Sequence, residues 1–564
     1  MRQHMNIFVK MAISLLVIGL YLSLTSVGFA KFVDRYWYST DGVQNGGHMD
    51  FMENTTPNDL DPHTGTTGTG GRNQHFNGLI KVSPLMDGIE LDLAESWSQP
   101  DPLTYIFKLR KGVRFQNLPP VNGRELTSAD VKYSLRRMAG LEIPPAPKST
   151  REKKKRGRAL GKGDFKHNYY MTELDRIETP DRYTVIIKTK VPFAPMLNYL
   201  GSAWAKIVAK EVVDQYGHLR HHKANIGSGA YILKEFRRDS HYLLERNPNY
   251  FKPGKPHVDS IRVNIVADES ARLAAFIARK IDAIIIPAHQ RQTLLEKASG
   301  AWFVESNTLY QAILRMPPWR SDKGPLKAPW NDVRVRRAVV HAIDKDKMIE
   351  LTQQGFADKN IANIPSTPGY TLPMSENPKF DPELSKKLLA EAGYPNGFKT
   401  EIMCWAAADQ QRQAEVAQAM LKKVGIDAEL KVLEFGAYFR RAYSYNYDMA
   451  IHVMTAAIDP DELLTPYFGR LPTSTYYKWS DPVLWDMIDK QKKIMQPRKR
   501  AKYVQDIQRR VLDQAMNVFL FSWRWMGARG PYMQTKSYLN DFQGVFREDD
   551  WLDLDKQKKW KAGM

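Results

Sequence analysis

Two patterns of apolar and polar residues alternate along this chain. Apolar residues in every second position, typical of strands, occur at 105–109 and 183–188. Apolar residues in every third or fourth position, typical of helices, occur at 128–138, where Thr127 or Ser128 is placed to cap the helix. The alternation predicts an α/β fold. Further helices are expected at 268–280, 333–342, 382–392 and 411–424, and further strands at 281–286 and 427–433.

The first thirty residues have the organisation of a secretory signal peptide. Arg2 and Lys10 precede an apolar run at 11–24, and Gly28 and Ala30 provide small residues for cleavage after Ala30. The run is shorter than the roughly 20 apolar residues of a spanning helix. We therefore expect a periplasmic protein, secreted across the inner membrane, and keep an uncleaved anchor as the alternative. No cysteine follows the run, so no lipid anchor is expected.

The composition predicts a packed interior and a basic surface. The 564 residues are 43% hydrophobic and 11% aromatic, and their formal net charge is +20. The single cysteine, Cys404, excludes an intramolecular disulfide and a cysteine metal cluster, and we expect it to pack as a small apolar side chain.

Basic residues are concentrated at Lys148–Lys166, which holds nine basic and two acidic residues. One interpretation is a solvated insertion between two elements, and the other is contact with an anionic membrane surface. The run lacks interleaved aromatic residues and a nucleic-acid fold motif, so we expect no nucleic-acid partner.

Three motifs follow one another between Leu93 and Arg137: LAESW, LRKGVRF and LTSADVKYSLRR. In this order they resemble the signature region of the family 5 extracellular solute-binding proteins, the receptors of peptide-type ABC importers. Five more segments are similar to motifs of the same family, and they extend the resemblance over most of the chain. These segments are 59–63 (DLDPH), 227–231 (GSGAY), 245–251 (ERNPNYF), 336–345 (RRAVVHAIDK) and 388–394 (LLAEAGY).

The resemblance implies a two-lobed α/β fold, periplasmic-binding-protein type 2-like, with an additional α+β domain on the first lobe. It also implies a monomeric receptor that closes around a peptide or peptide-like solute and delivers it to ABC transporter permease subunits. A non-transport envelope binding protein, such as a sensor, chaperone or anchoring protein, is the alternative on the same fold. The expected segments are the signal peptide at 1–30, lobe one at 31–73, 207–306 and 518–564, the additional domain at 74–206, and lobe two at 307–517.

No catalytic motif accompanies these segments. A nucleophile elbow, a P-loop and a metalloprotease helix are all missing from the sequence. Histidines 218, 221 and 222 are close in sequence but stand among basic residues in an expected loop. We therefore expect neither an enzyme nor a cofactor or metal site.

The ligand site is placed by a loop motif. In peptide-binding relatives a strand ends in D-x-x-D/E-P, whose first aspartate accepts the peptide's α-ammonium, with an aromatic residue three positions before it. Here Asp459-Pro460 matches the second half, Ala456 occupies the aspartate position and Val453 the aromatic position. Met454 and Thr455 lie between them and are candidate contacts.

Loss of one partner of a buried charge pair costs roughly 2–5 kcal/mol. Two hypotheses follow: the ligand has no free amino terminus, or it binds in a shifted register in which Asp459, Asp461 or Glu462 replaces the missing acid. Trp405, after another strand, is expected either to stack on the ligand or to close a core.

Two groups of polar and aromatic residues complete the candidates. Thr56 and Asn58 lie where relatives present polar groups to ligand. The alternation of Tyr443, Tyr445 and Tyr447 predicts one face of a strand.

Overall fold

The computed structural model describes residues 38–57, 59–65, 72–84, 88–144, 159–317, 328–364, 369–454, 459–470, 480–536 and 546–563. The expected signal peptide, Asn58, Thr455, Ala456 and residues 148–158 of the basic run lie outside them. No helix within these ranges is long and apolar enough to cross a membrane.

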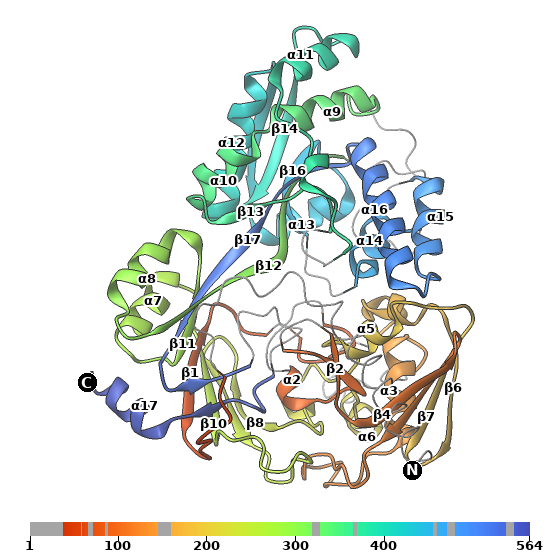
Figure 1. The fold of residues 1–564 in the computed structure, drawn as a ribbon, viewed down its shortest axis with the longest axis vertical. Helices are drawn as coiled ribbons and strands as arrows, with labels where there is room; N and C mark the ends of the chain where they lie inside the picture. Colours follow the sequence, from red (N-terminus) through yellow and green to blue (C-terminus); the bar gives the residue numbers. More distant parts are fainter. Residues whose placement is uncertain are drawn as a thin grey trace, which may run out of the picture.

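The first sheet is assembled from distant parts of the chain. Its order is β1 (His48–Glu53), β10 (Ser260–Ile265), β9 (His241–Arg246) and β8 (Tyr231–Arg237), with β1 parallel to β10. One hydrophobic core joins Met49, Phe276 and Leu552, so the end of the chain packs with its beginning. The helices beside this sheet are α7 (Glu269–Ile277), α8 (Arg291–Lys297) and α17 (Leu554–Lys561) (Figure 1).

The second sheet is antiparallel, in the order β4 (Ala94–Asp101), β5 (Thr104–Leu109), β7 (Thr184–Thr189), β6 (Leu174–Asp181). The predicted strands 105–109 and 183–188 and the predicted helix 128–138 are confirmed. The helix begins at Ser128 because Thr127 caps it: the Thr127 backbone N–H donates to Asp130 Oδ2 at 2.9 Å. The helices are α3 (Ser128–Met138), α5 (Met196–Gly201) and α6 (Lys210–Tyr216).

The third sheet connects two cores. Its order is β11–β17–β12–β16–β14–β15, with β13 paired to β17. The long antiparallel pair β12 (Trp302–Arg315) and β17 (Asn517–Arg529) has one end in the Met49 core, through Met526, and the other in a separate core, through Ala312 and Leu520 (Figure 1). The other strands are β11 (Ala283–Ile286), β13 (Ala357–Lys359), β14 (Phe398–Trp405), β15 (Ile426–Leu433) and β16 (Met449–Met454).

Helices cover this part of the molecule where the periodicity predicts them, within about three residues. Cys404 is buried among apolar residues, as expected.

The prediction that Tyr443, Tyr445 and Tyr447 lie on one face of a strand is wrong. Tyr443 belongs to a helix, and Tyr445, whose φ is 60°, ends that helix. The helix forms because Tyr438 and Ala442, four residues apart, share its buried face. The helices are α9 (Val333–Ala342), α10 (Lys345–Gln353), α11 (Pro382–Glu391), α12 (Ala408–Lys422), α13 (Phe435–Ser444), α14 (Asp461–Phe468), α15 (Pro482–Gln491) and α16 (Pro497–Asp513).

Within the described ranges, the remaining strands and helix are short: α2 (Arg72–His75), β2 (Ile80–Val82), β3 (Ile89–Leu91), β18 (Met533–Gln534) and β19 (Trp551–Leu552), apart from single 3-10 turns.

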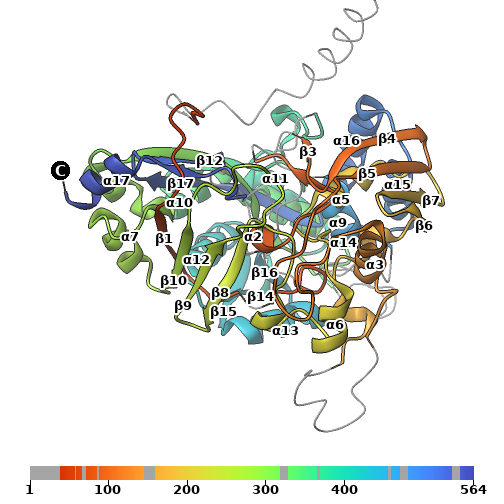
Figure 2. The same ribbon diagram turned by 90° about the horizontal axis from the view of Figure 1, so that it is seen from below.

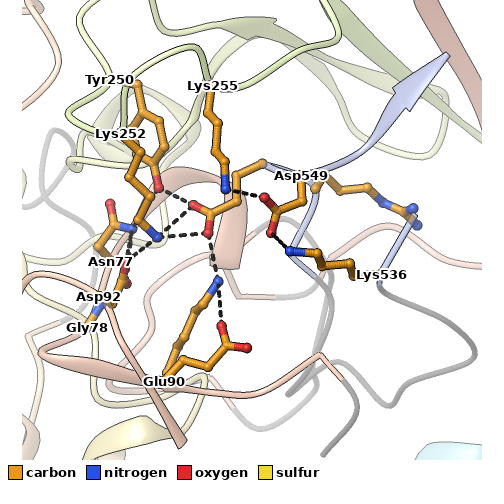
Figure 3. A network of polar contacts seen from close by, with 12 residues as sticks. Asn77, Gly78, Glu90, Asp92, Tyr250, Lys252, Lys255, Lys536 and Asp549 are labelled. Carbon is orange, nitrogen blue, oxygen red and sulfur yellow. Dashed lines mark hydrogen bonds and ion pairs between the residues drawn. The ribbon is translucent and has the colours of Figure 1, made fainter. Parts of the chain in front are cut away.

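A buried charge network holds the last segment of the chain in place (Figure 3). Glu548 accepts from Lys81 at 2.7 Å and from Lys252 at 2.8 Å, and Lys252 also pairs with Asp92 at 2.9 Å. Burial opposes ionisation of Glu548, but the two ammonium groups outweigh it and hold its pKa well below the usual range. The network therefore joins residues near 80–92, 250 and 548 into one unit.

Candidate functional site

The candidate site lies at the carboxyl ends of parallel strands β14 and β16. Ile402 on β14 pairs with Met449 on β16, which sets Trp405 close to the end of β16, where Val453 and Met454 lie. In open α/β sheets this edge is where ligands bind. After Met454 the chain leads to Asp459 and then to α14.

Trp405 belongs to an aromatic cluster. Its ring centroid lies 5.1 Å from Tyr438, 5.9 Å from Phe439 and 6.2 Å from Phe435. Tyr438 is buried and hydrogen-bonded to His452 at 2.8 Å, whereas the Phe435 side chain is 58% exposed. Trp405 itself is half-buried, so it packs on a core and also continues an aromatic surface open to solvent.

Val453 and Met454 face opposite sides of their strand. Met454 is fully buried in a core with Leu464 and Phe519, so its side chain serves packing. Val453 is half-buried and pairs with Ala312 of β12. Of the two, Val453 has the side chain with solvent access.

Asp459 is completely buried and fully engaged by protein groups. Arg500 of α16 donates to its two oxygens at 2.5 and 2.8 Å, and Asn198 of α5 donates at 2.9 Å. Burial opposes ionisation, yet the guanidinium of Arg500 outweighs it and lowers the pKa of Asp459. The carboxylate is thus ionised and held in a network within the protein.

The two acids that follow also accept hydrogen bonds from protein groups, and burial raises the pKa of Asp461. Asp461 accepts from the Tyr199 hydroxyl at 2.6 Å and from Gln491 at 2.7 Å. Glu462 accepts from the Tyr170 hydroxyl at 2.5 Å. The rings of Tyr170 and Tyr199 are stacked, with centroids 3.9 Å apart. Because of these contacts α5 and α14 lie side by side, as both views show (Figures 1 and 2).

Sequence reasoning missed Tyr170, Asn198, Tyr199 and Arg500. The first three are contacts between segments more than 250 residues apart in sequence, and no local pattern signals them. The sequence does mark the region of Arg500, because this residue lies in a markedly basic segment. It does not show which acidic side chain forms an ion pair with Arg500.

Thr56 is used elsewhere. Its hydroxyl donates to Asp239 Oδ1 at 2.8 Å and accepts from the Asp239 N–H at 2.7 Å, which ties the chain after β1 to the turn between β8 and β9. Neither of these hydrogen bonds reaches the segment between β16 and α14. The structure therefore places Val453, Met454 and Asp459 at the two ends of the segment between β16 and α14, with Trp405 close to the end of β16. It places Thr56 beside the first sheet, next to the turn between β8 and β9.

The described residues contain no group of three or more histidine, cysteine, aspartate or glutamate side chains arranged to hold a metal ion. The rings of His221 and His222 stack at 4.4 Å, and His222 also stacks on Phe236 at 5.9 Å. These rings pack against one another and an aromatic neighbour.

Comparison with known proteins identifies the family. The family model described as bacterial extracellular solute-binding proteins, family 5 Middle, matches residues 88–474, and the chain belongs to this family. The chain is 28% identical over 423 residues to heme-binding protein A of Haemophilus influenzae, covering 72% of this chain and 73% of that protein. It is 27% identical over 365 residues to the glutathione-binding protein GsiB of Escherichia coli K12, covering 64% of each.

Solved structures agree on the fold. The periplasmic binding protein DppA of Helicobacter pylori, in complex with the peptide STSA, is 25% identical with a TM-score of 0.73, over 90% of this chain and 99% of that one. The binding protein AgaA of A. tumefacien R10, in complex with agropinic acid, is 22% identical with a TM-score of 0.73, over 90% and 99%. The predicted family and the predicted periplasmic-binding-protein fold are confirmed. The family is one of binding proteins, so the chain is an extracellular-type solute-binding protein.

Proposed function

We propose that this protein is the periplasmic receptor of an ABC importer, which captures a peptide-like solute between two lobes and delivers it to the permease. The observation that carries the proposal is the contact of Asn198 and Tyr199 with Asp459 and Asp461. These contacts bring the first-lobe domain against the family's ligand loop, as a receptor that closes around its ligand requires.

Three cores bear on the proposed lobes. One joins Met49 with Leu552 and one is built around β12, β14 and β16. The third holds residues between 76 and 226, so it extends past the proposed end of the additional domain at 206 and includes α6. We keep lobe one at 31–73, 207–306 and 518–564, the additional domain at 74–206 and lobe two at 307–517, with the signal peptide cleaved after Ala30 and the mature protein monomeric.

The ligand is proposed to lack a free α-ammonium at the β16–α14 segment. Ala456 cannot accept an ammonium, and the carboxylates of Asp459, Asp461 and Glu462 already bind protein donors. A shifted register would have to take Asp459 from Arg500 and leave that buried guanidinium without its partner. A modified or cyclic peptide, an opine-like conjugate or an oligosaccharide meets this condition.

The aromatic surface completes the proposed ligand class. Phe435 and Trp405 offer exposed ring area on the face of the sheet that carries Tyr438 and His452, and such area stacks on planar or apolar groups. We therefore propose that the ligand places an apolar or planar part on these two rings.

Binding of matched peptides tests the proposal. Calorimetry compares a short peptide carrying an aromatic residue with its amino-acetylated form, on wild-type protein, W405A and F435A. We expect the acetylated peptide to bind more tightly and both variants to weaken its binding. F435A should keep the wild-type melting temperature because the Phe435 side chain is mostly exposed, whereas W405A should lower it because Trp405 also packs on a core. V432A, which truncates an apolar side chain that is 43% exposed on β15, is the matched control. Tighter binding of the free-amino peptide would contradict the proposed ligand class, and loss of solute uptake on gene deletion tests the receptor role separately.

A further inference from the structure

The turn between α15 and α16 carries a second basic segment. Residues 490–502 read KQKKIMQPRKRAK, with seven basic and no acidic residues. The segment lies at one edge of the molecule in both views, at the opposite end from α7 and α17 (Figures 1 and 2).

Two of these cations point inward, toward the acidic residues Asp459 and Asp461 at the start of α14. Arg500 is bound to Asp459 as described, and the Lys492 ammonium lies 3.9 Å from Asp461. Both side chains are buried, so they are not available to a partner.

The remaining five basic side chains of the segment differ from these two in exposure and in their contacts. All are exposed, and none of their side chains forms a hydrogen bond or an ion pair with any residue in the described ranges. Some exposed lysines elsewhere have acidic neighbours, such as Lys210 with Asp214 at 2.6 Å and Lys347 with Glu350 at 2.7 Å, whereas in this turn five cations without such neighbours lie within thirteen residues. The five are Lys490, Lys493, Arg498, Lys499 and Lys502.

A group of like charges without local counter-charges repels itself and attracts an anionic surface. Four of the five are lysines, a residue type that is depleted in protein–protein interfaces. Clusters of four to eight lysine and arginine residues are instead typical of proteins that bind anionic lipid headgroups.

We propose that the α15–α16 turn is a membrane-contact surface, which holds the protein against anionic lipid headgroups through these five cations. Such binding is electrostatic, because the five side chains are exposed cations. The surface is distinct from the proposed ligand site and from the basic run at 148–166. It concentrates the receptor near a membrane, where an importer would be.

Vesicle co-sedimentation of the full-length mature protein tests the surface. The probes are vesicles of phosphatidylcholine alone and of equal parts phosphatidylcholine and phosphatidylglycerol. We expect binding only to the second kind, weakened by salt because the charges are exposed. The five-fold variant K490Q/K493Q/R498Q/K499Q/K502Q should bind these vesicles more than tenfold less tightly, since each cation near the surface contributes roughly fivefold.

A matched variant removes the same number of charges elsewhere. R176Q/K210Q/K347Q/K386Q/K387Q neutralises five exposed cations that have acidic partners. It should retain vesicle binding, and both variants should keep ligand affinity and the wild-type circular dichroism spectrum.

Three outcomes would overturn the inference. The first is no binding of the wild-type protein to anionic vesicles, and the second is an equal loss in the two variants, which would make net charge the cause. The third is a five-fold variant that binds vesicles normally but fails in uptake, which would assign the turn to a protein partner. None of these outcomes contradicts the proposed receptor function. The first two concern vesicles alone, and a variant that binds ligand but fails in uptake still fits a receptor that delivers its ligand to a permease.

Discussion

Arg500 and Asp459 form a bidentate ion pair, with N–O distances of 2.5 and 2.8 Å and both side chains buried. The pair fixes the second acid of the family's loop motif in the protein scaffold. Together with Ala456 at the first position, it leaves the described part of the loop with carboxylates that all bind protein groups.

Replacing Arg500 with methionine should destabilise the protein by about 3–5 kcal/mol, because it leaves the Asp459 carboxylate buried without its cation. Urea unfolding measures the change. R498M, an exposed residue in the same helix, should cost less than about 0.5 kcal/mol. The double variant R500M/D459N should recover most of the loss, and an R500M protein as stable as wild type would contradict the pair's structural role.

Tyr199→Phe removes a donor that reaches Asp461 from the proposed additional domain of the first lobe. The buried carboxyl group loses one hydrogen bond, at a cost of about 1–2 kcal/mol. If the lobes close around the ligand as proposed, the closed form carries this cost. Ligand affinity measured by calorimetry should therefore fall roughly fivefold to thirtyfold.

Tyr105→Phe is the control for this effect. Its hydroxyl is equally buried but bonds to the Phe193 carbonyl within the first-lobe domain, at 3.1 Å. This change should lower stability and leave affinity unaltered. Equal affinities of Y199F and wild type would show that the Tyr199 contact does not contribute to closure.

Ala456→Asp restores the acid that anchors the α-ammonium in peptide-binding relatives. We expect the variant to bind a tripeptide with a free amino terminus at least tenfold more tightly than wild type does, in line with the energy of a close charge pair. An acetylated tripeptide should gain nothing. Unchanged binding of both peptides by A456D would remove Ala456 from the specificity argument.

Acid should weaken the network around Glu548. Burial raises the cost of ionising this carboxyl, but Lys81 and Lys252 more than offset it, so its folded pKa lies below the unfolded value of about 4.3. Its stabilising contribution is therefore present above about pH 4.3 and is lost as the pH falls further. Glu548→Gln should cost about 3–5 kcal/mol at neutral pH and flatten the acid limb of the stability profile.

Glu350→Gln removes an exposed partner of Lys347 and is the control for Glu548→Gln. Its effect on urea unfolding should stay below about 1 kcal/mol at every pH. An unaltered acid limb in E548Q would contradict the account of this network.

Local patterns predicted most elements of the fold, because periodicity and caps are properties of neighbouring residues. The helix 128–138 and its Thr127 cap follow from sequence alone. The tyrosines at 443, 445 and 447 were predicted wrongly because a short alternation fits both a strand and the end of a helix. The buried pair Tyr438 and Ala442, four residues apart, stabilises the helix.

The site was predicted less completely. Motif spacing selected Val453, Met454 and Asp459 as candidates, but the partners of Asp459 come from residues 198 and 500. Such contacts depend on how the lobes pack, which a single sequence does not encode in any local pattern.

The most direct test of the proposed ligand class is mass spectrometry of the small molecule that co-purifies with the periplasmic protein and is released by denaturation. We predict a compound without a free α-amino group, such as a blocked or cyclic peptide or a non-peptide conjugate. A set of ordinary linear peptides with free amino termini would contradict the account and would show that the segment around Ala456 binds them without the family's anchoring acid.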